Sequence, residues 1–284
     1  MRGDFIVLSH FQAKEIINSL DKKKEIYVSL DLGKSKNKVK IENKGVIFPD
    51  GEKLSFSELE KIKKDENKCY VVLENKAYPI LIFSEKTGWV RSLRPTKTAP
   101  TSTVAGFIMH RIKDIDPLKD TKLKLHHLKL KKHSLVLDTC TGLGYTAIEA
   151  AKNAKRVITV EIDEAALKIA KLNPWSKELF ESKNIEIKIG DIREIIKKFK
   201  DNLFTHIIHD PPNARLAGEL YSEALYKDFF KKLRFKGMLF HYIGNPEKKQ
   251  GSSLTPGVIK RLKSAGFKKV KKLPSAFGVL AYKL

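Results

Sequence analysis

The sequence predicts an α/β protein in which a mostly parallel sheet follows a small β-rich domain. From residue 134 onward, short apolar and β-branched runs alternate with helix-forming stretches. Such alternation is typical of parallel strands connected by helices. Two runs at the end of the chain are separated only by Pro274-Ser275. That connection is too short for a parallel crossover, so we expect these runs to pair antiparallel.

The first 90 residues have a different pattern. A helix is expected over residues 11–20 and another near 56–64. The other segments are alternating or β-branched runs bounded by turn signals such as Pro49-Asp50-Gly51. These runs cover residues 25–30, 38–41, 45–48 and 69–73. We therefore expect a mainly antiparallel domain over residues 1–90.

Residues 91–133 are expected to connect the two domains. The stretch 91–103 is rich in proline, threonine and basic residues, which is typical of a linker. A helix then ends near Leu130, with Asp120 and Thr121 as candidate capping residues.

The second domain is expected over residues 134–284. Its predicted parallel strands cover residues 134–138, 156–160, 185–189, 205–209 and 238–243. The predicted terminal hairpin joins residues 267–273 to 276–282.

The charge balance favours a polyanionic partner. The chain of 284 residues has 56 lysine and arginine residues against 33 acidic residues, a formal net charge of +23. Such an excess attracts nucleic acid. Abundant lysine with scarce glutamine is also typical of heat-adapted proteins, in which glutamate rises with lysine. Glutamate does not keep pace here, so the composition favours RNA over thermal adaptation.

The same composition bears on membranes, disulfides and metals. The chain has no apolar run of membrane-spanning length and no secretory leader pattern, so we expect a soluble, cytoplasmic protein. Cys69 and Cys140 are too few for a disulfide framework and lack metal-type spacing. We expect no metal site.

The most informative motif is a glycine turn after the first predicted parallel strand. Asp138 opens the turn, Gly142 and Gly144 follow, and Glu161 ends the next strand. The glycines allow a sharp turn and close approach to a ligand, and a carboxylate about twenty residues on can accept hydrogen bonds from ribose hydroxyls. An acid at position 138 would repel a pyrophosphate but suits a cationic ligand.

These residues resemble motifs I and II of the class I (Rossmann-like) methyltransferases. The resemblance implies S-adenosylmethionine as cofactor, held by Asp138, Gly142, Gly144, Glu161 and the neighbouring Ile162. It also implies that the segment before the first parallel strand can close over the cofactor.

Two residues after the third strand extend the expected cofactor site. Asp191 can accept a hydrogen bond from the adenine amino group, and Ile192 can cover the ring. Alternatively, Asp191 caps the helix that begins near Arg193.

The fourth parallel strand ends in Asp210-Pro211-Pro212-Asn213. This segment resembles motif IV of methyltransferases that act on exocyclic amines of nucleobases. There the acid and a proline-fixed carbonyl, here Asp210 and Pro211, accept hydrogen bonds from the amine and orient it. Asn213 departs from the pattern, because an aromatic residue normally stands there, and this weakens the case for base methylation.

The segment after this motif raises an alternative function. Around Leu220-Tyr221 it is similar to the amine-pocket segment of the polyamine aminopropyltransferases, the spermidine synthase family. Against that family, the first glycine turn differs, and a chain of charge +23 is a poor attractor for a polycation.

The second half of the chain also resembles an archaeal group of predicted methyltransferases. On the expected sheet edge, the candidate substrate-binding residues are Tyr221, His241, Tyr242 and Asn245. For His241, a buried and satisfied strand-end histidine is the simpler interpretation.

Together these observations predict an enzyme that uses S-adenosylmethionine to methylate a nucleobase nitrogen in transfer or ribosomal RNA. The alternatives are aminopropyl transfer and an RNA-binding protein with an inert cofactor fold. The sequence predicts no oligomeric state.

Overall fold

The computed structural model describes residues 5–20, 24–245 and 249–284. The chain divides into two compact units. The first comprises Met1–Pro117 and Ala165–Glu178, and the second comprises Leu118–Glu164 and Leu179–Leu284. This division differs from the three segments expected from the sequence, because a piece from the middle of the chain belongs to the N-terminal unit.

The N-terminal unit is rich in antiparallel β-structure, as predicted. Its sheets have the strand orders β1-β6-β7, β2-β3-β4-β5 and β11-β10-β9-β8. The strands are β1 (Val7–Leu8), β2 (Glu25–Val28), β3 (Asn37–Glu42), β4 (Gly45–Ile47), β5 (Lys53–Ser55), β6 (Tyr70–Leu73), β7 (Lys76–Pro79), β8 (Leu81–Ser84), β9 (Trp89–Arg94), β10 (Thr101–Val104) and β11 (Phe107–Ile108). The predicted helices are α1 (His10–Ile17) and α2 (Phe56–Lys64).

The expected linker at residues 91–103 is wrong. Most of this stretch lies in β9 and β10, which pair antiparallel with Arg91 opposite Val104. The side chains of Ser92 and Thr103 are joined across the two strands by a hydrogen bond of 2.6 Å. Threonine is β-branched and favours strands, so a composition that suits a linker also suits a hairpin whose prolines lie in its connection.

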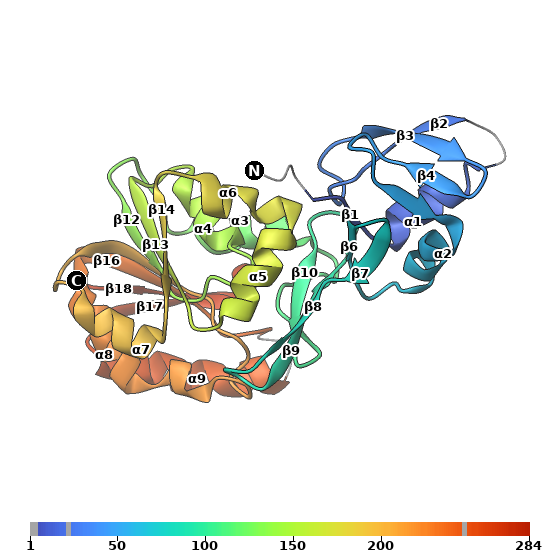
Figure 1. The fold of residues 1–284 in the computed structure, drawn as a ribbon. Helices are drawn as coiled ribbons and strands as arrows, with labels where there is room; N and C mark the ends of the chain where they lie inside the picture. The colour runs from blue at the N-terminus through green and yellow to red at the C-terminus, as the bar shows by residue number, and fades with distance from the viewer. Residues whose placement is uncertain (1–4, 21–23, 246–248) are drawn as a thin grey trace. The chain divides into compact units, whose positions relative to one another are not determined.

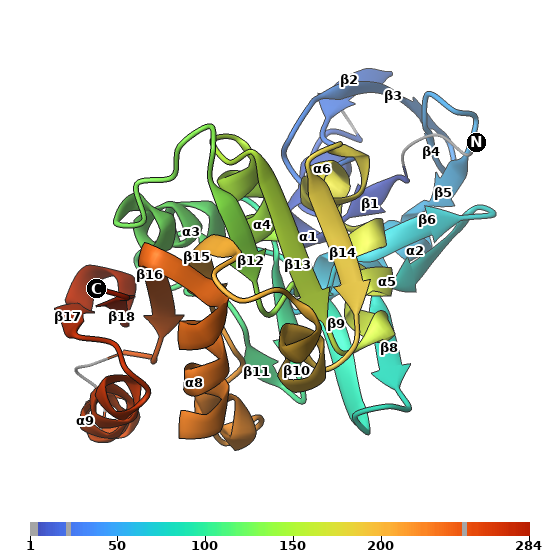
Figure 2. The same ribbon diagram turned by 90° about the vertical axis from the view of Figure 1, so that its left-hand side faces the viewer.

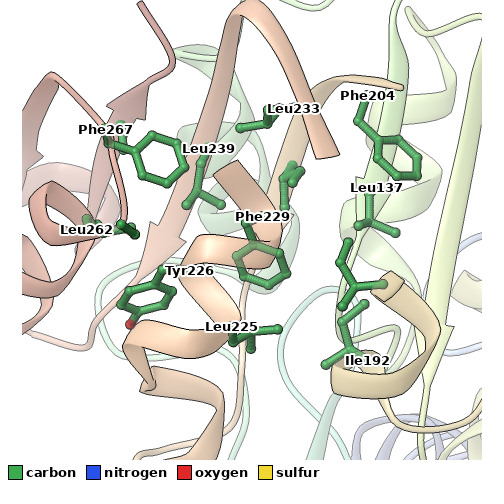
Figure 3. Close-up of a cluster of buried hydrophobic side chains, with 14 of the residues drawn as sticks. Leu137, Ile192, Phe204, Leu225, Tyr226, Phe229, Leu233, Leu239, Leu262 and Phe267 are labelled. Atoms are coloured by element: carbon green, nitrogen blue, oxygen red, sulfur yellow. The ribbon is translucent and has the colours of Figure 1, made fainter. Parts of the chain in front are cut away.

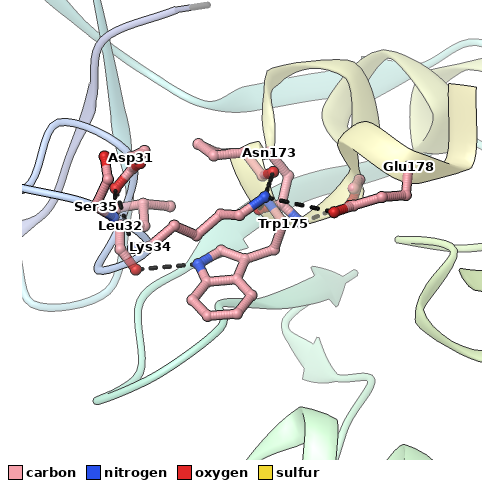
Figure 4. A network of polar contacts seen from close by, with 9 residues as sticks. Asp31, Leu32, Lys34, Ser35, Asn173, Trp175 and Glu178 are labelled. Atoms are coloured by element: carbon pink, nitrogen blue, oxygen red, sulfur yellow. Dashed lines mark hydrogen bonds and ion pairs between the residues drawn. The ribbon is translucent and has the colours of Figure 1, made fainter. Parts of the chain in front are cut away.

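The first unit also contains helix α5 (Glu164–Leu172), apart from its first residue, and the short helix η1 (Pro174–Ser176). Figure 4 shows how the loop after β2 meets η1. The indole Nε1 of Trp175 donates to the carbonyl of Leu32 at 3.0 Å, and Lys34 Nζ donates to the carbonyl of Pro174 at 2.9 Å. Lys34 also lies over the Trp175 ring, 5.7 Å from its centroid. Trp175 therefore has a structural role within this unit.

The second unit is built on a mostly parallel sheet with the strand order β14-β13-β12-β15-β16-β18-β17. Figure 2 shows several of its strands side by side. The strands are β12 (Leu135–Asp138), β13 (Arg156–Glu161), β14 (Ile185–Ile189), β15 (Phe204–His209), β16 (Leu233–Tyr242), β17 (Lys269–Leu273) and β18 (Gly278–Tyr282). β17 and β18 form the predicted antiparallel hairpin, and β18 also pairs antiparallel with β16.

Helices cover both faces of this sheet (Figure 1). α7, α8 and α9 lie on one face, and α3 and α4 lie on the other. Their bounds are α3 (Pro117–His126), α4 (Tyr145–Ala151), α7 (Ile192–Ile195), α8 (Glu223–Lys232) and α9 (Lys249–Ser264), and the unit also contains α6 (Lys177–Glu181) from Leu179 onward, η2 (Ile196–Lys198), η3 (Gly218–Tyr221) and η4 (Pro274–Ala276).

A buried apolar cluster joins the sheet to α7, α8 and α9 (Figure 3). Leu137 from β12 and Leu239 from β16 meet Phe229 from α8, and each is fully buried. Burying such side chains is the main favourable contribution to folding. Because the strands are fixed by this packing, their carboxyl ends hold the polar side chains that follow at one edge of the sheet.

Along the described ranges, no helix combines the length and apolarity that a membrane span requires.

Candidate functional site

The turn between β12 and α4 needs both of its glycines, but for different reasons. Gly142 has φ of 53°, and a Cβ atom added there would meet no atom within 4 Å. Gly144 has φ of 79° and is the N-cap of α4, and an added Cβ would lie 2.6 Å from a methyl carbon of Leu179. Both conformations are left-handed, which favours glycine. Gly142 therefore borders open space, whereas Gly144 allows tight packing.

Asp138 is a buried acid with an unsatisfied oxygen. It is 0% exposed, and its Oδ2 accepts hydrogen bonds from Thr159 at 2.8 Å and Thr146 at 3.2 Å. Its Oδ1 is also buried, and no described residue forms a hydrogen bond with it. Burial raises the pKa of Asp138 to about 7, although the two threonine hydroxyls oppose the rise. A buried, unpartnered acceptor of this kind favours a donor, above all a cationic one.

Glu161, at the end of β13, ties the glycine turn to the next strand. Its Oε2 accepts from the Gly142 amide at 2.9 Å, and its Oε1 accepts from the Asp163 amide at 3.1 Å. The side chain is held in one orientation by these bonds. Each carboxylate oxygen has a second lone pair, so the group can still accept hydrogen bonds from a ligand's hydroxyls.

Two exposed apolar side chains lie beside Glu161. Ile162 is 37% exposed, and Ile189, the last residue of β14, is 54% exposed. Glu161 and Ile189 are register partners in the parallel pair β13 and β14. Our sequence reasoning missed Ile189, although its place before Gly190 at the end of a predicted strand was a usable signal. These side chains can cover a flat apolar ring.

Asp191 and Ile192 have structural roles that the sequence left open. Asp191 is the N-cap of α7 and accepts a hydrogen bond from the Arg193 amide at 2.9 Å. This is the capping role that the sequence offered as an alternative to an adenine contact. The Asp191 carboxylate also forms an ion pair with Arg193 at 2.6 Å. Ile192 is only 4% exposed and belongs to the apolar core. The expectation that Ile192 covers a cofactor ring does not fit this burial, because its side chain faces inward.

Asp210 follows β15, and the side chain of Lys124 from α3 reaches it. Lys124 Nζ lies 2.6 Å from Asp210 Oδ2. Lys124 is 1% exposed, whereas the Asp210 side chain retains 17% exposure. Burial raises the pKa of Asp210, and the Lys124 ammonium opposes that rise. Sequence reasoning missed Lys124, since nothing in its helix distinguishes it from the many surface lysines.

The residues after Asp210 form a braced turn. The Tyr221 hydroxyl donates to the carbonyl of Pro212 at 3.0 Å, and Asn213 Oδ1 accepts from the Arg215 amide at 2.9 Å. Pro211 is buried. Tyr221 is 5% exposed, so it supports the turn from beneath and is not open to a substrate in this structure.

His241 is likewise buried. It is 0% exposed, and its Nε2 is 2.7 Å from the Tyr226 hydroxyl. The prediction that His241 contacts substrate does not fit this position, because the strand carries the side chain into the interior. Tyr242, the next residue, points the other way, and its ring centroid lies 4.6 Å from Lys124 Nζ. Asn245 follows β16 and is half-buried.

His209, the last residue of β15, stabilises the same region as a neutral ring. Its Nε2 lies 2.8 Å from the carbonyl of Leu220, which can only accept, so Nε2 carries the proton. Its Nδ1 then accepts from the Thr139 hydroxyl at 2.6 Å. Burial lowers the pKa of His209 to about 4. In the part of the chain that the structure describes, no cluster of side chains has the makings of a metal site.

The chain is similar to known proteins in sequence. Residues 112–249 match the methyltransferase small domain family. An uncharacterized protein of Methanocaldococcus jannaschii, MJ1233, is 46% identical over 276 residues, which cover 95% of this chain and 93% of that protein. This chain belongs to the same family as MJ1233 and contains a methyltransferase small domain.

Other relatives match smaller parts of this chain. The human protein tRNA (uracil-5-)-methyltransferase homolog A is 33% identical over 91 residues, which are 31% of this chain and 14% of that protein. Members of the methyltransferase small domain family generally use S-adenosylmethionine.

Solved structures confirm the α/β fold of the chain. A spermidine synthase in complex with the transition state analogue AdoDATO has a TM-score of 0.59 at 20% identity, covering 74% of this chain and 78% of that one. The spermidine synthase of Thermotoga maritima has a TM-score of 0.57 at 18% identity, covering 74% of this chain and 76% of its own. At such low identity the likeness concerns the fold alone.

Proposed function

We propose that this methyltransferase binds S-adenosylmethionine at the carboxyl edge of its parallel sheet. The observation that carries the proposal is the buried Asp138 Oδ1 beside a glycine turn, an acceptor to which no described residue donates a hydrogen bond. The amino group of the cofactor is a donor of the required charge. Glu161 would hold the ribose hydroxyls, and Ile162 and Ile189 would cover the adenine. The open space over Gly142 supports the same placement.

We infer that the acceptor is a nitrogen on a nucleobase of transfer or ribosomal RNA. The net charge of +23 supports a polyanionic substrate, and the partial similarity to tRNA methyltransferase homologues supports RNA. The bound cofactor supplies a methyl group on a cationic sulfur, so the nitrogen lone pair forms the new N–C bond, the C–S pair returns to sulfur and the nitrogen then releases a proton. Asp210 would orient the acceptor amine, and orientation alone can supply much of the rate.

The proposal is tested by methyl transfer to RNA. Tritiated S-adenosylmethionine is supplied with bulk RNA from a strain that lacks the gene, and nucleosides are then identified by mass spectrometry. We expect one methylated nucleoside. Asp210→Ala should lower its formation by about 100-fold or more, because the acceptor loses its orienting oxygen. Asp228→Ala, which removes an acid from α8, is the matched control and should keep full activity.

The affinity for S-adenosylmethionine shows whether Asp210 orients the acceptor or binds the cofactor. Asp210→Ala should bind S-adenosylmethionine nearly as well as the natural chain, since Asp138 and Glu161 are unchanged. Labelling of RNA by Asp210→Ala at the natural rate would contradict the role given to Asp210. No labelling by the natural chain would contradict RNA methylation.

The fold likeness to spermidine synthases favours aminopropyl transfer as the second candidate. That reaction uses decarboxylated S-adenosylmethionine and an alkylamine, which is protonated at neutral pH. The basic charge of the chain opposes such a substrate.

A further inference from the structure

Lys124 is a lysine in an unusual place. It lies on α3, outside the sequence motifs of the site, and is 1% exposed. Lysine is almost never so deeply buried unless it is paired. Its Nζ lies 2.6 Å from Asp210 Oδ2 and 3.0 Å from Asp120 Oδ2, and Asp120 is 0% exposed. The third neighbour is the ring of Tyr242, 4.6 Å from Nζ to the ring centroid. The ammonium is thus held from three sides.

Lys124 keeps its positive charge in spite of its burial. Burial by itself would lower the pKa of Lys124, but the carboxylates of Asp210 and Asp120 outweigh burial and raise it. Lys124 is therefore an ammonium at neutral pH. Asp120 and Lys124 are four residues apart on one helix, so α3 delivers both to the same side.

Asp210 is bound through one oxygen. Within the described ranges, the hydrogen bond from Lys124 to Oδ2 is the only one that the Asp210 side chain accepts. The 17% exposure of this side chain contrasts with the burial of Asp120 and Lys124. Oδ1 of Asp210 is therefore available to a ligand, while Oδ2 and the orientation of the carboxylate are fixed from behind.

We propose that Lys124 is a positioning residue that aims Asp210 Oδ1 at the N–H of an uncharged amine. This inference rests on the proposed function and narrows its substrate class. An exocyclic amine of a nucleobase is neutral and donates an N–H directly. A protonated alkylamine must first lose a proton, and a carboxylate already paired with an ammonium is a weak base for that purpose. The ion pair thus favours the neutral amine.

Other titratable groups also face Asp210, and Lys124→Met leaves them unchanged. They are Asp120 from α3, Asp138 from β12, Cys140 from the glycine turn and Tyr221 from η3, while Tyr242 from β16 faces Lys124.

Lys124→Met removes the ammonium and keeps most of the side-chain length. We expect S-adenosylmethionine affinity within about threefold of the natural chain, with kcat for RNA methylation lowered by about 100-fold. The remaining activity should fall off at a higher pH on the acid side, because Asp210 without its ammonium is protonated more readily. Lys232→Met is the matched control, since Lys232 is also buried, at 6% exposure, but pairs with Asp201. The control should leave kcat and its pH profile unchanged.

A second readout does not need activity. The carboxyl carbons of the intact chain, labelled with ¹³C at aspartate, are titrated by NMR, and Asp210 is assigned with Asp210→Asn. We expect the pKa of Asp210 to rise by at least about one unit in Lys124→Met. If Lys124→Met does not fold, the double variant Asp120→Asn, Lys124→Met removes the buried charge pair and is titrated instead.

The two readouts separate the two claims. An unmoved pKa of Asp210, or an unchanged kcat, would overturn the positioning role of Lys124. If the natural chain methylates no RNA although the pKa of Asp210 rises in Lys124→Met, the proposed function is wrong, but the ion pair between Lys124 and Asp210 is confirmed.

Discussion

Asp138 is the residue whose chemistry depends most directly on the fold. Burial and the neighbouring carboxylates of Asp210 and Glu161 raise its pKa to about 7, so near neutral pH the group is poised between its two forms. A cationic ligand at Oδ1 would favour the ionised form. The cofactor should therefore displace a proton from Asp138 as it binds.

This coupling predicts that S-adenosylmethionine binds more tightly as pH rises through 7. If only ionised Asp138 binds the ligand, affinity should increase about tenfold between about pH 6 and pH 8. Calorimetry at several pH values measures the change. Asp138→Asn should bind more weakly and lose most of this pH dependence, because its amide does not titrate.

Folding stability changes with pH in the opposite direction to cofactor affinity. The pKa of Asp138 is higher in the folded chain, about 7, than the ordinary aspartate value of 3.8, so the folded state holds the proton more firmly. The stability from this group is complete below about pH 4 and is lost as pH rises through about 7. Without ligand, Asp138→Asn should therefore show a smaller loss of unfolding free energy over that range. An identical pH dependence in both proteins would show that Asp138 is not buried as described.

At the scale of the element, the strand, glycine turn and helix around residues 138–151 show what the sequence could and could not predict. The motif predicted the turn and its neighbouring carboxylate, because glycine spacing and strand patterning are local properties. It did not separate the tasks of Gly142 and Gly144. That difference depends on Leu179, which is distant in sequence and packs against Gly144.

Two alanine variants separate these tasks. Gly142→Ala should cost about 1–2 kcal/mol for its left-handed backbone, and weaken cofactor binding, because the new methyl group enters open space at the site. Gly144→Ala should cost clearly more unfolding free energy, since its Cβ would also lie 2.6 Å from Leu179. Denaturant unfolding and calorimetry measure both quantities. Equal destabilisation by the two variants would contradict the packing role of Gly144.

The polar ends of the other strands were predicted with uneven success for a similar reason. The position of Asp210 at a strand end follows from the pattern of apolar residues before it. The burial of His241 and Ile192 depends on which face of the sheet or helix each side chain takes, and a shift of one residue reverses that face. The role of Lys124 depends on a long-range contact between α3 and Asp210, the residue after β15, which no local sequence pattern indicates.

At the scale of the whole molecule, the parallel sheet could be predicted because its strands are apolar or β-branched runs that alternate with helix-forming stretches. The terminal hairpin could be predicted because the Pro274-Ser275 connection is too short for a parallel crossover. The sequence did not predict that Ala165–Glu178 belongs to the N-terminal unit. That membership depends on tertiary contacts such as that between Trp175 and Leu32. The stretch 91–103 was misread because its threonines suit strands as well as linkers.

The two proposed chemistries differ in the form of the cofactor that the molecule should prefer. Methyl transfer uses S-adenosylmethionine itself, whereas aminopropyl transfer uses its decarboxylated form. The carboxyl edge of the parallel sheet, with Asp138, Glu161 and the glycine turn, is the same in both cases. Direct comparison of the two ligands on the intact chain therefore decides which reaction the site serves.

Isothermal titration calorimetry of the intact chain with S-adenosylmethionine and with its decarboxylated form is that measurement. We expect one site per chain, with S-adenosylmethionine bound at least about tenfold more tightly than its decarboxylated form. Tighter binding of the decarboxylated form, or no binding of either, would contradict it.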